Sequence, residues 1–245
     1  MALGAASGIG PGGFTIPAGF KIIHVRADDQ PRVAAVARLF TAYTDSLGID
    51  LTYQNYAAEL AELPGKYGPP NGALLLLVRS GRDTEEVDVE TTDEAVGCVA
   101  LRALPDVVNG TYSDGNVLCE EDGGERSSSS RNGHGGTVVR KRRRRAEIKR
   151  LYVDPAARGH RLGRALFAAV LDEARRKGYD EVVLDTLAHM TEAQRMYERE
   201  GFVKLEEPYY DVAGGGDNDD DKVVGRAENQ RQKHPEGTVF YRLEL

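Results

Sequence analysis

The feature that most constrains the fold is a strand, then a turn containing glycine and arginine, then a helix. Branched and apolar residues from Ile148 to Val153 predict the strand, and apolar residues at helical spacing predict a helix from Leu162 to Lys177. The turn spans Pro155 to Gly163. A helix N-terminus presents unpaired N–H groups and partial positive charge, and glycines let the backbone approach an anion closely. The segment therefore predicts a phosphate-binding turn between a strand and a helix.

The elements around this segment predict an α/β fold with one mixed sheet of about seven strands and flanking helices. Asp28 or Asp29 is expected to cap the first helix, and Thr191 with Gln194 forms a capping box for the last one. The predicted strands are 20–26, 73–79, 95–104, 148–153, 181–185, 202–205 and 238–243, and the predicted helices are 31–46, 53–63, 162–177 and 191–201.

Two stretches of low complexity interrupt this pattern. Residues 105–145 hold glycine pairs, a serine run and a basic run, and residues 213–235 hold a glycine run and an acidic run. Few large apolar residues occur in either, so neither can bury a core of its own. We expect a flexible leader over 1–19 and a single domain over 20–245, with disordered insertions at 105–145 and 213–235.

Composition narrows the class of protein. The chain has 245 residues, of which 40% are hydrophobic, and a formal net charge of -7, which argues against a general nucleic-acid binder. Two cysteines are too few for a disulfide framework. The most apolar stretch, 73–78, is far shorter than a membrane span, and the N-terminus lacks the pattern of a secretory signal. These observations predict the cytoplasm, with the nucleus left open by the basic run 140–145.

Three kinds of phosphate-binding turn were compared with the segment that follows Val153. A P-loop ends in Gly-Lys-Ser/Thr, and a dinucleotide fingerprint requires Gly-x-Gly-x-x-Gly after an early strand, and both patterns are missing here. The third, Gln/Arg-x-x-Gly-x-Gly/Ala, is matched by Arg158-Gly159-His160-Arg161-Leu162-Gly163, with Arg161 at the middle glycine position.

This third pattern is the pyrophosphate loop of the GNAT superfamily of N-acetyltransferases, which the segment from Glu147 to Phe202 resembles. The resemblance implies the GNAT fold and acetyl-CoA as co-substrate, with no metal. It also implies the residues that hold the cofactor, namely Leu151, Tyr152, Val153, Arg158, Gly159, His160, Arg161, Leu162, Gly163 and Arg164.

The resemblance also implies two catalytic residues. Residues 193–202 resemble the family's helix–strand junction, where a tyrosine at the position of Tyr197 protonates the departing thiolate. A glutamate at the position of Glu147 deprotonates the acceptor amine, directly or through water, because only the neutral amine is nucleophilic. The family also has a bulge in this strand that frees backbone N–H groups near Val153 to bind the acetyl carbonyl. The alternatives are that Tyr197 only packs its helix and that Glu147 is a salt-bridged strand-end residue.

The acceptor is expected to be a small amine or an amino-acid-like molecule, with a protein lysine as the alternative. Tyr43, Tyr53, Tyr209 and Tyr210 are candidates to line its pocket, with ordinary packing as the other interpretation. No membrane or nucleic-acid partner is expected, and a homodimer stays open. Two other functions remain as hypotheses: a non-catalytic CoA-binding sensor or scaffold, and a nucleic-acid-associated protein acting through 140–145.

Overall fold

The computed structural model describes residues 16–48, 55–80, 93–108, 142–209 and 234–245, and the side chains of 107, 108 and 142 are not described. Seven strands form one sheet in the order β1-β2-β3-β4-β5-β7-β6. The strands are β1 (Phe20–His24), β2 (Ala73–Arg79), β3 (Glu94–Val108), β4 (Arg142–Val153), β5 (Glu181–Leu187), β6 (Val203–Leu205) and β7 (Thr238–Glu244). The helices are α1 (Gln30–Leu47), α2 (Tyr56–Ala61), α3 (Leu162–Arg176) and α4 (Thr191–Arg199), with 3₁₀ turns η3 (Gly65–Tyr67) and η4 (Pro155–Ala157).

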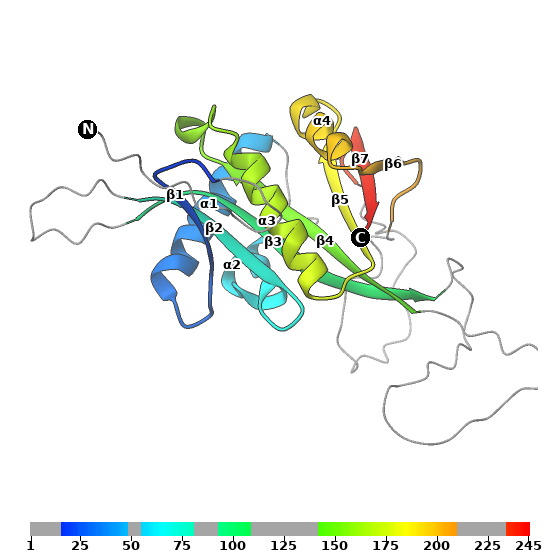
Figure 1. Cartoon of the computed structure of the whole chain (residues 1–245), viewed down its shortest axis with the longest axis horizontal. Coiled ribbons are helices and arrows are strands. Elements are labelled where there is room, and N and C mark those ends of the chain that lie inside the picture. The colour runs from blue at the N-terminus through cyan, green and yellow to red at the C-terminus, as the bar shows by residue number, and fades with distance from the viewer. Residues whose placement is uncertain (1–15, 49–54, 81–92, 109–141, 210–233) are drawn as a thin grey trace, which may run out of the picture.

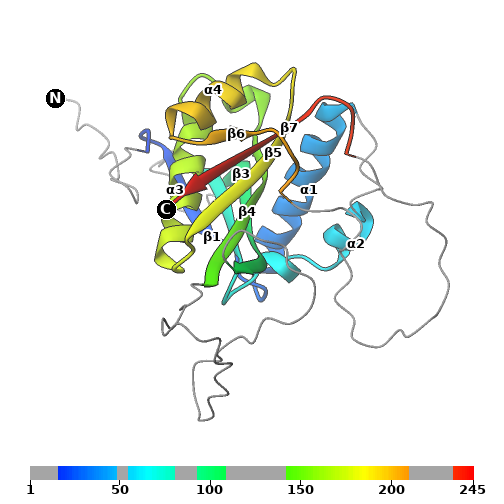
Figure 2. The ribbon, with the colours of Figure 1, turned by 90° about the vertical axis from the view of Figure 1, so that its right-hand side faces the viewer.

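The sheet is covered on both faces, with α3 and α4 on one side and α1 and α2 on the other (Figures 1 and 2). Strand β2 shows why its sequence reads as continuously apolar. Leu75 and Leu77 belong to the core under α3, whereas Leu74 and Leu76 belong to the core under α1. Successive side chains of a strand point to opposite faces, so a strand covered twice is apolar at every position. The predicted mixed sheet with flanking helices is confirmed.

The parallel pair in this sheet is β4 and β5, and the connection between them is the predicted turn and α3. The other neighbouring strands pair antiparallel. A parallel pair needs a crossover connection, which is why the turn and the helix sit at the centre of the molecule rather than at its edge.

The structure confirms the predicted N-terminal cap of one helix and contradicts the predicted cap of another. Asp29 caps α1, where its carboxylate accepts the N–H of Arg32 at 3.2 Å. The capping box expected for α4 is wrong: Met190 is the N-cap residue, without a side-chain cap. Gln194 instead donates its amide to the carbonyls of residues 187 and 188. Its side chain thus fixes the loop before α4.

The strands extend further into the first predicted insertion than the sequence indicates. Strand β3 reaches Val108 and β4 begins at Arg142, whereas the sequence predicts strand ends at 104 and 148. The leader up to 15 and the insertion residues 109–141 and 213–233 lie outside the described residues. None of the described helices is long and apolar enough to cross a membrane.

Candidate active site

The turn after β4 is held by Asp154 and shaped by two left-handed residues. Asp154 donates its N–H to the carbonyl of Val96 at 2.8 Å, and its carboxylate accepts the N–H of Ala156 at 2.9 Å. Gly159 has φ +93° and Arg161 has φ +57°. A left-handed residue with a Cβ carries a cost of about 1–2 kcal/mol, which explains why a glycine suits the position of Arg161.

Helix α3 begins at this turn without a side-chain cap. Its N-cap residue is Arg161, which makes no side-chain cap bond, and the first bond of the helix runs from the N–H of Ala165 to the carbonyl of Arg161. The N–H groups of Leu162 and Gly163 precede that bond. Uncapped N–H groups and the helix dipole make this end of α3 suited to an anion.

A groove of about 270 Å³ runs beside the uncapped end of α3. Eight of the ten predicted cofactor residues line it. The other two point elsewhere: the His160 ring contacts Phe20, and the Arg164 guanidinium pairs with Glu200 at 2.9 Å. The groove is lined by Tyr43, Ser46, Leu151, Tyr152, Val153, Arg158, Gly159, Arg161, Leu162, Gly163 and Met190.

Strands β4 and β5 separate next to this groove. Their parallel pairing ends at Glu147 and Val183, although β4 continues to Val153. On its other side, β4 has one more residue than β3 between two paired positions, and Arg150 there has φ +58°. This is a β-bulge, which bends a strand and increases its twist. The bulge in the fourth strand, implied by the family resemblance, is therefore present in the structure.

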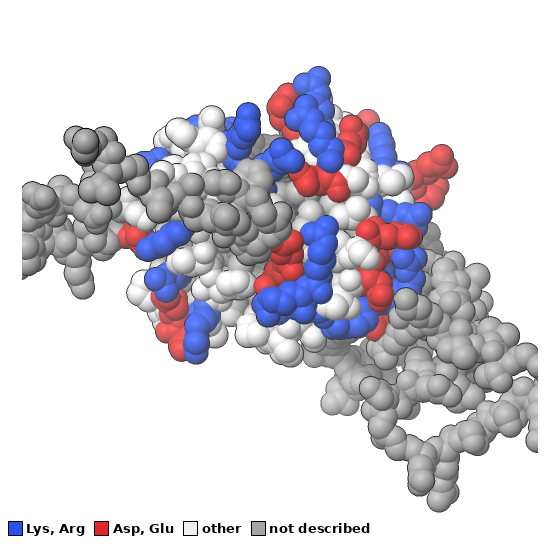
Figure 3. All heavy atoms as spheres, viewed as in Figure 1, with Lys and Arg blue, Asp and Glu red and all other residues white. Residues whose placement is uncertain are grey.

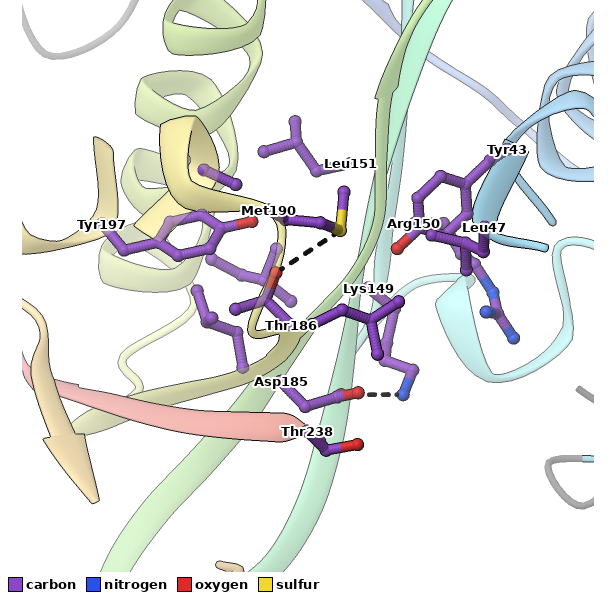
Figure 4. A pocket seen from close by; sticks show the side chains of 14 residues that line it. Tyr43, Leu47, Lys149, Arg150, Leu151, Asp185, Thr186, Met190, Tyr197 and Thr238 are labelled. Atoms are coloured by element: carbon purple, nitrogen blue, oxygen red, sulfur yellow. Dashed lines mark hydrogen bonds and ion pairs between the residues drawn. The ribbon is translucent and has the colours of Figure 1, made fainter. Parts of the chain in front are cut away.

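A second cavity, of about 90 Å³, lies in the gap between the two strands (Figure 4). It shares Tyr43, Leu151 and Met190 with the groove, so the two spaces adjoin. Its walls come from α1, β4, β5, α4 and the start of β7. The cavity is lined by Tyr43, Leu47, Ile148, Lys149, Arg150, Leu151, Leu184, Asp185, Thr186, Leu187, Met190, Ala193, Tyr197 and Thr238.

Tyr197 reaches this cavity from α4. Its ring packs against Phe167, Phe202 and Tyr241 at centroid distances of 5.1–6.2 Å, and its hydroxyl points toward Met190 at the cavity (Figure 4). Burial raises the pKa of the Tyr197 hydroxyl well above its usual value. Tyr197 is therefore a protonated hydroxyl directed into the cavity, as well as part of the core.

Glu147 lies behind the cavity wall and does not line it. Its side chain is fully buried and pairs with Arg102, while Tyr209 donates its hydroxyl to Oε1 at 2.7 Å. Lys149 Nζ lies 3.4 Å from the same oxygen. The Tyr209 hydroxyl also lies 3.3 Å from Asp185 Oδ1. Tyr209 thus connects the buried glutamate to a carboxylate that does line the cavity.

Of the four predicted acceptor-side tyrosines, Tyr43 lines both spaces and Tyr209 lies in the polar network behind the cavity. Burial raises the pKa of the Tyr43 hydroxyl. Tyr53 and Tyr210 lie outside the described residues. In the described part of the chain, no group of three or more His, Cys, Asp and Glu side chains could hold a metal ion.

Comparison with known proteins agrees with this geometry. Residues 81–202 match the model of the acetyltransferase (GNAT) family. An uncharacterised N-acetyltransferase of Schizosaccharomyces pombe is 33% identical over 172 residues, which span 70% of this chain and 76% of that protein. An uncharacterised N-acetyltransferase of Dictyostelium discoideum is 36% identical over 203 residues, which span 73% of this chain and 88% of that protein.

The chain belongs to the GNAT acetyltransferase family. A chain of the NatC complex, whose crystal structure contains a Gag peptide and CoA, has the same fold, with a TM-score of 0.50 and 17% identity. That match covers 92% of this chain and 98% of the other. The resemblance that the Glu147 to Phe202 segment carries is thus confirmed, and with it the assignment as an acyltransferase.

This GNAT chain uses part of its basic run inside the fold, which corrects the prediction that the disordered insertion extends to residue 145. Arg145 pairs with Glu181 at 2.7 Å and Arg143 with Glu244 at 3.1 Å. Arg144 donates to the carbonyl of Lys177 at the end of α3. On the face seen in Figure 3, basic and acidic side chains lie beside each other over α3 and α4. Residues 140 and 141 lie outside the described residues.

Two charged pairs in the GNAT site are absent from the sequence-based prediction. Lys149 and Asp185 form an ion pair of 3.1 Å at the cavity. Arg150, at the bulge, pairs with Glu59 of α2 through contacts of 2.8 and 3.0 Å. Burial acts to raise the pKa of Glu59, but Arg150 and Lys66 outweigh it and bring the pKa to about 2. A carboxylate inside the apolar strand run 182–187 was the signal that could have identified Asp185.

Proposed function

We propose that this chain transfers the acetyl group of acetyl-CoA to a primary amine by direct attack in a ternary complex. The observation that carries the proposal is the meeting of the two spaces at Leu151. One is an anion-suited groove at the N-terminus of α3, and the other is a cavity between separated strands. A thioester lying along β4 would have its phosphates in the groove and its acetyl group at the cavity. The CoA bound in the NatC structure supports the choice of cofactor.

The groove supplies the contacts that a pyrophosphate needs. The N–H groups at the start of α3 and the open backbone at Gly159 would receive it, and the exposed side chains of Arg158 and Arg161 add charge. The gap opposite β5 leaves the edge of β4 beside the cavity, where backbone N–H groups can polarise the acetyl carbonyl.

The chemistry then divides between Tyr197 and Glu147. The amine nitrogen attacks the carbonyl carbon, the carbon–sulfur bond breaks, and the Tyr197 hydroxyl protonates the departing thiolate. The proton of the amine passes through a bridging water to Tyr209, which lies behind the cavity lining and accepts the proton on its oxygen while donating its own hydrogen to Oε1 of Glu147. This relay fits a glutamate that is fully buried behind the cavity wall.

The test is incubation with acetyl-CoA and a panel of primary amines, with free CoA measured by a thiol reagent and CoA binding by calorimetry. We expect CoA binding and amine-dependent release of CoA. Binding without release for any amine would support the sensor or scaffold instead, and absence of CoA binding at millimolar ligand would overturn the proposal entirely.

A Tyr197→Phe variant tests the acid. It keeps the ring that packs against Phe167 and removes the hydroxyl at the cavity. We expect turnover to fall about 100-fold, the lower end of the range for general acid catalysis, with an unchanged dissociation constant for CoA. Tyr241→Phe, on the neighbouring ring outside the cavity lining, is the matched control. Equal turnover in Tyr197→Phe and wild type would leave Tyr197 a packing residue.

A further inference from the structure

The cavity wall contains one acidic side chain among the 14 residues that line it, and that residue is Asp185. We propose that Asp185 anchors the ammonium group of the acceptor, which makes the acceptor an aliphatic amine that arrives with a positive charge. This inference rests on the proposed function and names the substrate class for the same site.

The first support is position. Asp185 lies on β5 two residues beyond Val183, where the pairing with β4 ends. Its side chain is 18% exposed, whereas that of Glu147 is fully buried. Of the two carboxylates that Tyr209 contacts, Asp185 is therefore the one that an acceptor in the cavity can touch directly.

The second support is the remaining hydrogen-bonding capacity of Asp185. Its Oδ1 atom accepts a hydrogen bond from Lys149 Nζ at 3.1 Å, and the Tyr209 hydroxyl, whose one hydrogen is directed to Glu147, lies 3.3 Å away. Within the described residues its Oδ2 atom accepts no hydrogen bond, and a carboxylate has about four acceptor sites in all. Thr238, shown beside Asp185 in Figure 4, donates its hydroxyl to the Pro235 carbonyl, so its oxygen also remains able to accept. An ammonium group has three donors and can use both atoms.

The third support is charge. Burial acts to raise the pKa of Asp185, but Lys149 and Arg150 on β4 and His234 before β7 act against it, and the net pKa lies below the usual value. Arg150 already has Glu59 as its partner, and Lys149 lies between Glu147 and Asp185. Asp185 is thus held ionised. An ionised carboxylate that is a weak base binds a cation well and removes its proton poorly, so deprotonation remains with Glu147.

The test compares amines of the same shape and different charge. At neutral pH propylamine is an ammonium ion, whereas ethoxyamine, which replaces one methylene by oxygen, is neutral. Asp185→Asn should lower kcat/KM for propylamine by about 10- to 100-fold through a higher KM, the size expected for a hydrogen bond to a charged group. The same variant should change kcat/KM for ethoxyamine less than about threefold, because a neutral acceptor does not use the charge.

Asp180→Asn is the matched control, because Asp180 directly precedes β5 and its carboxylate accepts the N–H of Arg144 away from the cavity. We expect no change in the preference between the two amines. An equal loss for both amines in Asp185→Asn would overturn the inference in favour of a structural role for the Lys149 pair. A fall in kcat alone would overturn it in favour of a catalytic base.

Failure of the proposed transferase function gives a different result from failure of the Asp185 anchor. A wild-type protein that binds CoA but releases it with no amine of the panel would refute the transferase reaction, and amine binding could still be measured. Calorimetry then measures the dissociation constant of propylamine for the CoA-bound protein, which tests whether Asp185 anchors the ammonium group. Weaker binding by Asp185→Asn than by wild type would support the anchor, and equal binding would overturn it.

Discussion

The groove beside α3 and the cavity between β4 and β5 share three residues but differ in which parts of the chain line them. The groove takes eight of its eleven lining residues from the single stretch 151–163, and its anion-suited part is backbone. The cavity takes its walls from five separate elements, and its polar part is a set of paired side chains. The difference teaches that cofactor recognition here is local in sequence, whereas acceptor recognition is assembled by tertiary contacts.

If this division is right, variants of the cavity should change turnover and acceptor preference, and variants of the groove should change CoA affinity. The largest effect is expected for Glu147→Gln. Removing the base should lower kcat by about 100- to 10,000-fold and flatten the pH profile, while the dissociation constant for CoA stays within about twofold. Steady-state kinetics and calorimetry measure the two quantities.

Glu181→Gln is the control for this experiment, because Glu181 is also buried, but its carboxylate pairs with Arg145 and not with Tyr209, which connects Glu147 to the cavity. Its kcat should stay close to that of the wild type. A loss of CoA affinity in Glu147→Gln, or the same fall in kcat for both variants, would contradict the idea that the cavity controls turnover and the groove controls CoA affinity.

The second effect concerns the ion pair that holds the bulge. The pKa of Glu59 is lowered from 4.5 to about 2 in the folded protein, so its contribution to stability is present above the unfolded pKa and is lost as pH falls toward 2. The shift corresponds to about 3 kcal/mol, since one pKa unit is about 1.4 kcal/mol. Glu59→Gln should lower the free energy of unfolding by about that amount at neutral pH, with the difference narrowing below pH 4.5.

Urea unfolding at a series of pH values measures this difference. Glu192→Gln, at an exposed carboxylate that pairs with Arg195 on the surface of α4, should change the free energy of unfolding very little. A difference between Glu59→Gln and wild type that does not vary with pH would mean that Glu59 contributes packing rather than charge.

A smaller effect is expected in the groove. Gly159 has φ +93°, and a Cβ there would have no protein atom within 4 Å, so it would extend into the space proposed for the pyrophosphate. Gly159→Ala should weaken CoA binding about 10-fold and leave kcat at saturating acetyl-CoA within about twofold, because the methyl group occupies that space and strain of about 1–2 kcal/mol moves the turn out of the shape that receives the phosphates. Gly201→Ala introduces similar strain at φ +91°, outside the lining of the groove, and should not change CoA affinity. Equal affinities for Gly159→Ala and wild type would place the phosphates elsewhere.

The smallest effect is expected at Arg161. Replacing it by glycine relieves a left-handed residue at about 1–2 kcal/mol but adds about 0.5–1 kcal/mol of chain entropy, so the net gain is about 0.5 kcal/mol. Thermal unfolding should show a slightly higher Tm for Arg161→Gly. A lower Tm would mean that the arginine side chain makes stabilising contacts that outweigh its backbone strain.

The sequence predicted most of the fold because its patterns are local. Periodicity located the helices, and continuous apolar runs located strands such as β2 that are covered on both faces. It failed where partners are distant in the chain. Arg143 and Arg145 look like part of a solvated basic run until Glu244 and Glu181 are brought beside them. Thr191 and Gln194 match a capping box, but Gln194 finds better partners in two loop carbonyls.

For the site, the sequence by itself determined the turn from Pro155 to Gly163, because a helix start and two glycines act through neighbouring backbone. It also supplied Tyr197 and Glu147 through the family resemblance. Only the tertiary structure decided that Glu147 is buried, that Tyr209 links it to Asp185, and that Glu59 holds Arg150 at the bulge. Charge pairs between separate elements depend on how those elements pack. A short-range sequence pattern does not determine the distance between two side chains on such elements.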